Sequence, residues 1–341
     1  MEIKEYIREF NFWDIVQSRQ PKVVVLGGGT GLSVILRGLK KYTNELTAVV
    51  SVGDDGGSSG ILRSDLGMIP PGDIRNCITA LADDESIMQD LFNYRFSEGE
   101  LSGHSFGNLF LAAMDGISFD FYDAVRRTSD VLQITGRVLP VSLEEMVLIA
   151  TLENGLVVEG ESTIPQVSKR TGAPIHHMRL KNEVRALPET IDAILEAEII
   201  ILGPGSLFTS LLPHLLVEGI EEAIKKSRAK KFYIANIMSQ PGETHGMTQN
   251  DAVTILERHQ QLEGHLFQYI LVNESEFERQ VIETYGKTSS KPMEIGEKKP
   301  GYDYVVRDFS SADLSRVRHN ADSLAQTIFQ IALENPKHKL T

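Results

Sequence analysis

The sequence predicts an α/β protein with a doubly wound, mostly parallel sheet and helices on both faces. Short apolar runs that lack polar alternation are typical of strands buried on both faces, and here they alternate with segments of helical period. The predicted strands are Val23–Leu26, Ala48–Val52, Ile199–Leu202, Phe232–Ile237 and Tyr269–Val272. The predicted helices are Leu32–Tyr42, Ile74–Leu81, Leu109–Met114, Leu207–Leu212 and Ala252–Glu257.

The middle of the chain predicts a small antiparallel insertion at about 140–190. Met146–Leu152 and Leu156–Glu161 read as two strands of a hairpin, joined by a turn that needs a positive φ at Gly155. No linker or repeat divides the rest, so residues 21–341 are expected to form a single domain.

Residues 1–20 predict a separate amphipathic helix, because apolar residues recur at three- and four-residue spacing until Pro21. We expect this helix to pack on the main domain or on a second subunit, which makes a homodimer plausible. Its acidic residues disfavour an anionic membrane surface.

Composition excludes several classes of protein. The chain has 341 residues, a hydrophobic fraction of 41% and a net charge of −13, which describe an ordinary globular protein that repels nucleic acid. Its single cysteine, Cys77, fits a reducing compartment and reads as a small buried residue rather than a nucleophile. No apolar stretch approaches the roughly 20 residues of a membrane span. We therefore expect a cytoplasmic protein without nucleic-acid partners.

The first glycine loop predicts an anion site. Gly27, Gly28, Gly29, Thr30 and Gly31 follow a buried strand and open an apolar helix, so free backbone N–H groups and the helix N-terminus face one point. The loop departs from the dinucleotide fingerprint, because Leu32 stands where the third glycine would be. A tight turn that serves packing alone is the alternative.

A second loop carries two adjacent carboxylates, Asp54 and Asp55, followed by five small residues. They are candidates for a catalytic role, for holding a ribose or sugar hydroxyl, or for a divalent cation bridged to phosphate. The small residues suit a flexible flap over the ligand or a solvated loop. Residues 56–60 also match G-x-S-x-G, but that hydrolase elbow must lie directly between a strand and a helix, which this spacing disfavours.

A third loop repeats the strand-to-glycine pattern at Gly203, Pro204, Gly205 and Ser206, and Ser206 is expected to cap the next helix. Parallel strands present their carboxyl ends at one edge of a sheet, so the three loops should converge there. That convergence makes the prediction of a phosphate-bearing nucleotide ligand specific.

Polar residues from further segments are expected at the same edge. Asp73 reads as a helix N-cap, Arg75 as a phosphate or carboxylate clamp, and Asn236 precedes a strand-end loop at Gln240–Thr244. Metal motifs are absent from the sequence, since His176 and His177 are adjacent and no H-E-x-x-H occurs. The candidate ligand contacts are Asp73, Arg75, Asn76, His104, Asn108 and Asn236.

These ordered motifs, from about Pro21 to the C-terminus, are similar to the YvcK-type gluconeogenesis factors of the CofD-like superfamily. The resemblance implies a Rossmann-like fold, binding of UDP-N-acetylglucosamine, and a role in cell shape and growth on gluconeogenic carbon, with protein partners in cell-envelope control. By the same resemblance, Asp54 or Asp55 matches an acidic, metal-binding position. Arg318 and Tyr285 are then the residues to contact the sugar or diphosphate.

Three functions remain open from the sequence. The first is a non-catalytic regulator that binds a nucleotide sugar. The second is a phospholactyl- or nucleotidyl-type transferase acting on a nucleotide diphosphate donor, as the related 2-phospho-lactate transferase does. The third is an NAD-binding protein, against which Leu32 counts.

Overall fold

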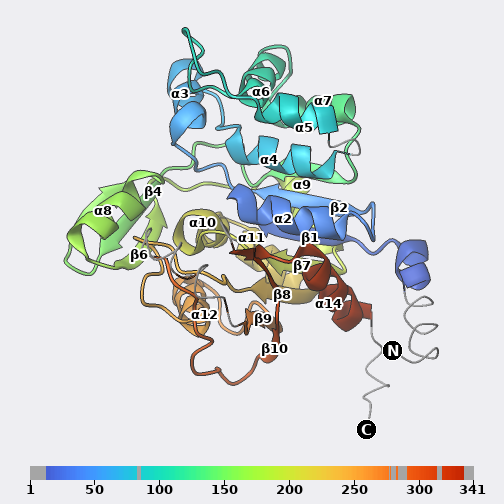
Figure 1. Ribbon diagram of the computed structural model, residues 1–341, viewed down its shortest axis with the longest axis vertical. Helices are drawn as coiled ribbons and strands as arrows, with labels where there is room; N and C mark the ends of the chain where they lie inside the picture. Colours follow the sequence, from blue (N-terminus) through green and yellow to red (C-terminus); the bar gives the residue numbers. More distant parts are fainter. Residues whose placement is uncertain are drawn as a thin grey trace.

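The computed structural model describes residues 13–82, 86–275, 277, 282, 290–312 and 317–333. Its centre is a seven-stranded parallel sheet with the strand order β10-β9-β8-β7-β1-β2-β3 (Figure 1). The predicted doubly wound fold class is therefore confirmed. The strands are β1 (Val23–Gly27), β2 (Leu46–Val50), β3 (Arg137–Pro140), β7 (Ile199–Leu202), β8 (Lys230–Ile234), β9 (Tyr269–Asn273) and β10 (Asp303–Arg307).

The strand order places a topological switch point between β1 and β7. From β1 the chain winds outward through β2 and β3, and after β7 it winds the other way through β8, β9 and β10. In open α/β sheets, ligands bind where the order reverses, outside the carboxyl ends of the strands. The loops after β1 and β7 are the two loops that meet at this point.

Helices cover both faces of the sheet. Val23 and Val25 of β1 pack with α2, α4, α7 and α14, whereas Val24 and Leu26 pack with α9 to α12 and with the insertion. Figure 1 shows α3 to α7 as a further layer above α2. The helices are α2 (Gly29–Leu39), α3 (Gly57–Leu66), α4 (Gly72–Leu81), α5 (Ser86–Asn93), α6 (Phe106–Gly116), α7 (Phe121–Leu132), α8 (Thr163–Thr171), α9 (Pro188–Glu196), η1 (a π-helix, Leu207–Leu211), α10 (Leu212–Leu216), α11 (Ile220–Lys226), α12 (Gln249–His259) and α14 (Ala321–Leu333).

The insertion is an antiparallel sheet of order β5-β4-β6 together with α8. The hairpin turn carries Gly155 at a φ of +84°, the positive value that its sequence predicts. The strands are β4 (Leu148–Leu152), β5 (Val157–Glu159) and β6 (Ile175–Leu180). A further antiparallel pair, β11 (Ser310–Ala312) and β12 (Val317–His319), brings the C-terminal part of the chain back toward the sheet edge.

The N-terminal segment is helical over residues 13–19, and residues 1–12 of the predicted helix lie outside the described part. Trp13 packs on Tyr42 with ring centroids 4.6 Å apart, and Tyr42 packs in turn on Phe329 of α14 at 5.4 Å. Within the described residues, no helix is long and apolar enough to cross a membrane.

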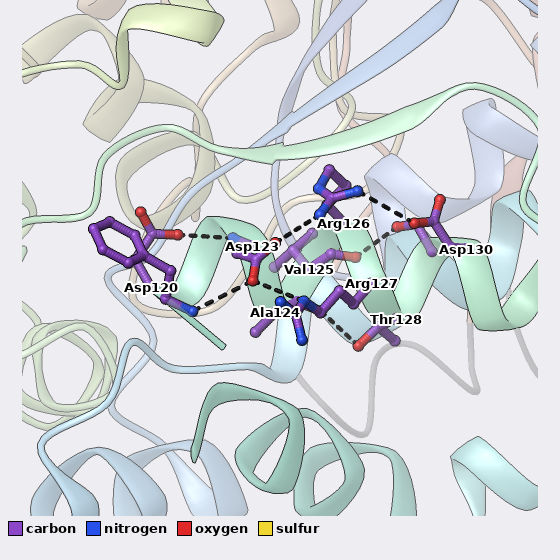
Figure 2. A network of polar contacts seen from close by, with 10 residues as sticks. Asp120, Asp123, Ala124, Val125, Arg126, Arg127, Thr128 and Asp130 are labelled. Carbon is purple, nitrogen blue, oxygen red and sulfur yellow. Dashed lines mark hydrogen bonds and ion pairs between the residues drawn. The ribbon is translucent and has the colours of Figure 1, made fainter. Parts of the chain in front are cut away.

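The outer helix α7 is organised by its own charges (Figure 2). Asp120 caps it by accepting a hydrogen bond from Asp123 N at 2.7 Å, and Asp123 forms ion pairs with Arg126 at 2.8 Å and Arg127 at 2.7 Å. Both arginines are about half exposed, so the ion pairs contribute little stability and the cap contributes more.

Candidate ligand-binding site

A cavity of about 230 Å³ lies at the switch point, over the carboxyl ends of β1, β7 and β8. It joins the two glycine loops that the sequence predicted to converge, and Arg318 of β12 reaches it from the C-terminal part of the chain. The lining residues are Gly28, Gly29, Thr30, Gly31, Val34, Pro204, Gly205, Ser206, Ser210, Asn236, Ile237, Met238, Gln240, Val317, Arg318 and His319.

The first glycine loop turns sharply and stays open to the cavity. Gly27 ends β1, Gly28 is the extended N-cap of α2, and Gly29 begins the helix with a φ of +64° and open space where a Cβ would stand. Gly31 serves a close approach instead, since a Cβ there would lie 2.5 Å from the carbonyl oxygen of Pro204. The N-terminal amides of α2 have no partner within the helix, so the loop offers donors to an anion.

The second glycine loop follows β7 and is fixed by side chains from the loop after β8. Gly203 has a φ of +94°, and Asn236 Nδ2 donates to the Gly205 carbonyl at 2.7 Å. The predicted cap at Ser206 is wrong: this residue holds the N-cap position of η1 but makes no capping bond. Its Oγ accepts instead from Gln240 Nε2 at 2.7 Å, and it also hydrogen-bonds Glu243.

Asp73 is not the N-cap that the sequence predicted, because α4 already begins at Gly72 with Pro71 at its N-cap. The Asp73 carboxylate lies against Gly28 and accepts a hydrogen bond from the Gly29 amide. Burial raises its pKa from 3.8 to about 6, and neighbouring Asp54 adds to the rise. Asp73 therefore occupies one amide of the anion loop, which leaves those of Thr30 and Gly31 for a ligand.

The two adjacent carboxylates after β2 have different roles. Asp54 Oδ1 accepts from Gly56 N at 2.9 Å, whereas both oxygens of Asp55 are taken by the amides of Glu161 and Ser162 at 2.9 and 2.8 Å. Asp55 thus attaches the insertion to the core. Neither residue lines the cavity, and the described residues contain no group of three or more His, Cys, Asp or Glu able to hold a metal ion.

The flexible flap predicted after these carboxylates is wrong. Gly57 to Gly60 form the first turn of α3, and Ser58 and Ser59 are buried. Small residues are required there by packing, because a Cβ on Gly60 would lie 2.0 Å from the carbonyl oxygen of Asp55.

Ser58, His104 and Asn108 form a buried cluster apart from the cavity. Ser58 Oγ lies 3.0 Å from His104 Nδ1 and accepts from Asn108 Nδ2 at 3.1 Å. Arg75 lies beside α6 and donates to Asn76 at 2.7 Å, and burial is the main cause of its lowered pKa. The structure therefore brings Arg75, His104 and Asn108 together, but not to the edge of the cavity.

Gln240, Ser210 and His319 line the cavity although the sequence did not name them as ligand contacts. The strand-end position of the Gln240 loop was the signal that could have identified it. Burial lowers the pKa of His319 to about 4 and raises that of Glu161, from the insertion, to about 8. Tyr285 lies outside the described residues.

A doubly wound sheet with two glycine loops and a cavity at its switch point defines a Rossmann-like α/β protein with a candidate ligand site at the carboxyl edge of its sheet. Residues 23–310 match the family model described as 2-phospho-L-lactate transferase CofD, and the chain belongs to that family.

Three relatives show how much of the chain is shared. The gluconeogenesis factor of Bacillus subtilis is 46% identical over 93% of this chain and 99% of its own length. A putative gluconeogenesis factor of Clostridium acetobutylicum is 49% identical over 92% of this chain and 70% of its own length. A crystal structure of a UPF0052 family protein from Bacillus halodurans superposes with a TM-score of 0.86 at 42% identity, covering 91% of this chain and 98% of that one.

Proposed function

We propose that this chain binds a nucleotide sugar, UDP-N-acetylglucosamine, and acts as a regulatory protein rather than an enzyme. The cavity at the β1–β7 switch point carries this proposal, because backbone amides, a helix N-terminus and Arg318 meet there. Such a donor set suits a diphosphate. A cavity of about 230 Å³ is smaller than the roughly 300–1,000 Å³ usual for ligand sites, so part of the ligand would lie outside it.

The cellular role follows from the relatives. Proteins named gluconeogenesis factor that are 46% identical along nearly their whole length support a role in growth on gluconeogenic carbon. Maintenance of cell shape, cytoplasmic location, a homodimer and protein partners in cell-envelope control belong to the same proposal. Binding of a cell-wall precursor would couple carbon supply to envelope synthesis.

Titration calorimetry tests the binding directly. Folded protein titrated with UDP-N-acetylglucosamine should release or absorb heat with one site per chain, and Gly29→Val protein should not. Absence of heat at millimolar ligand, with the protein shown to be folded, would remove this function. NAD is the competing ligand, and thermal stabilisation by NAD without any by UDP-N-acetylglucosamine would favour it.

A transferase acting on a nucleotide diphosphate donor is the second candidate. The family model's description as a transferase favours it, as does a group of carboxyls near the glycine loop, Asp54, Asp73 and Glu161. Incubation with nucleotide diphosphate donors, a divalent cation and a phospholactyl acceptor separates the two functions. Catalysis would be established if wild-type protein releases nucleotide from the donor and Asp54→Asn protein does not. If the donor stays intact, the non-catalytic regulator remains the proposed function.

A further inference from the structure

Gln240 lines the cavity and carries a buried side-chain acceptor. Its side-chain amide donates from Nε2 to Ser206, whereas Oε1 is buried and has no hydrogen-bond partner among the described residues. Buried polar groups are nearly always paired, so an unpaired oxygen in a cavity wall points to a donor that arrives with a ligand.

The orientation of this amide is fixed by a relay. Glu243 is buried and accepts hydrogen bonds from Phe208 N at 3.0 Å, from Thr209 Oγ1 at 3.2 Å and from Ser206. Burial raises the pKa of Glu243, whereas the hydrogen bonds from Phe208, Thr209 and Ser206 lower it and favour the carboxylate. A carboxylate only accepts, so the Ser206 hydroxyl donates to it and the Ser206 lone pair takes the Gln240 N–H. If the Gln240 amide were flipped, its oxygen would face the Ser206 hydroxyl, whose proton is already donated to Glu243. The free group of Gln240 is therefore an acceptor.

Other groups of the polar wall are donors. Thr30 and Gly31 contribute N-terminal amides of α2, and Arg318 contributes a guanidinium, all of them donors. Asn236 Nδ2 donates to the Gly205 carbonyl, which leaves its Oδ1 as a second side-chain acceptor in the wall. The cavity thus offers donors to an anion and, at Gln240, an acceptor to a neutral donor.

We propose that Gln240 is a specificity-determining residue whose Oε1 accepts a hydrogen bond from an uncharged N–H or O–H group of the bound ligand, with Ser206 as its positioning residue. The site then selects molecules that carry both a phosphate and such a donor. In a nucleotide sugar the donor is either the imide N–H of the base or a group on the sugar. This inference rests on the proposed function.

Calorimetry with two probes tests the assignment. Wild-type and Gln240→Met proteins are titrated with UDP-N-acetylglucosamine and with inorganic pyrophosphate, which has the charge but no neutral N–H donor. Gln240→Met should weaken the affinity for the nucleotide sugar roughly tenfold or more and change the affinity for pyrophosphate by no more than about twofold. Equal weakening of both probes, or unchanged affinity for both, would overturn the assignment.

Two further pairs of ligands identify the donor. Uridine monophosphate against its N3-methyl derivative tests the base, and UDP-glucose against UDP-2-deoxyglucose tests the sugar. Wild type should discriminate within one pair, and Gln240→Met and Ser206→Ala should lose that discrimination while Ser206→Thr keeps it. Discrimination that survives in Gln240→Met refutes the role of Gln240 alone. Folded wild type that binds none of these probes refutes the proposed function, and this assignment with it.

Discussion

The cavity at the switch point and the buried cluster around Ser58 differ in how they use polar groups, although the sequence predicted both as parts of one site. The cavity is lined by the two glycine loops, by the loop after β8 and by residues of α2 and β12, and Gly29 has open space where a Cβ would stand. The cluster pairs Ser58 with His104 and with Asn108 inside the helical layer, and it leaves Asn108 Oδ1 and the neighbouring Arg75 Nε buried without a hydrogen-bond partner among the described residues. The two hydrogen bonds of Ser58 stabilise the fold, whereas the N-terminal amides of α2, which have no partner within the helix, are open to a ligand at the cavity.

Two matched glycines test this difference with the largest expected effect. Gly29 and Gly57 are both the first residue of a helix, both have a positive φ, and both have open space at the Cβ position. Gly29→Val should abolish ligand binding, because its side chain would fill the phosphate position, while Gly57→Val should bind as wild type. Each should lose about 1–2 kcal/mol of unfolding free energy. Calorimetry and thermal unfolding measure both, and equal loss of binding would erase the distinction.

Two arginines give the next effect. Arg318→Ala should weaken binding by about 1.5–3 kcal/mol, as expected for a charge-assisted phosphate contact, with unchanged stability because the side chain is exposed. Arg75→Ala should lower the free energy of unfolding and leave the ligand affinity unchanged, since Arg75 is largely buried beside Asp73 and Asp54. Wild-type affinity in Arg318→Ala protein would show that Arg318 does not contact the ligand.

The carboxylate beneath the glycine loop predicts a smaller, pH-dependent effect. The pKa of Asp73 is raised to about 6, so the group is ionised above pH 6 and repels a phosphate, and it is neutral below. A nucleotide sugar keeps its diphosphate charge over this range. Affinity should therefore rise by about 1 kcal/mol between pH 7.5 and 5.5.

Asp73→Asn is the matched control, because it keeps an acceptor for the Gly29 amide. The affinity of Asp73→Asn protein for the nucleotide sugar should be high and should not change with pH over the same pH range. A parallel pH slope in wild type and Asp73→Asn would place the titrating group elsewhere. The same raised pKa means that ionised Asp73 costs stability, a cost absent below pH 4 and complete above pH 6.

The smallest effect on binding is expected inside the cluster. Ser58→Ala removes the partner of His104 and Asn108, so unfolding free energy should fall by about 1–3 kcal/mol while ligand affinity stays within about twofold. Chemical denaturation and calorimetry measure the two quantities. A large loss of affinity in folded Ser58→Ala protein would join the cluster to the ligand site.

Much of the fold was predictable because its central strands are buried on both faces. β1, β7 and β9 appear in sequence as unbroken apolar runs. β3 and β10 were not predicted, since β3 begins at exposed Arg137 and ends at Pro140 and β10 is partly exposed, so neither carries that pattern. The helix predicted at Leu207–Leu212 begins as a π-helix, where Phe208 N bonds the buried Glu243.

The parts of the site formed by backbone loops could be predicted from the sequence, whereas the hydrogen-bond partners of its side chains could not. The convergence of the Gly28 and Gly205 loops follows from strand direction alone. Asp55 accepts hydrogen bonds from the insertion, and Asn108 donates one to Ser58. These partners depend on how α6 and α8 pack on the core rather than on any local motif. The sequence placed the loop of Gln240 at the sheet edge but did not name Gln240 as a ligand contact, because its free oxygen depends on a hydrogen bond to Ser206, 34 positions away in the sequence.

A crystal structure of the chain with UDP-N-acetylglucosamine tests the central claim most directly. We expect the diphosphate at the amides of Thr30 and Gly31, within reach of Arg318, and a donor of the base or sugar at Gln240. Ligand density over Arg75 and Asn108, with the glycine loop empty, would contradict it.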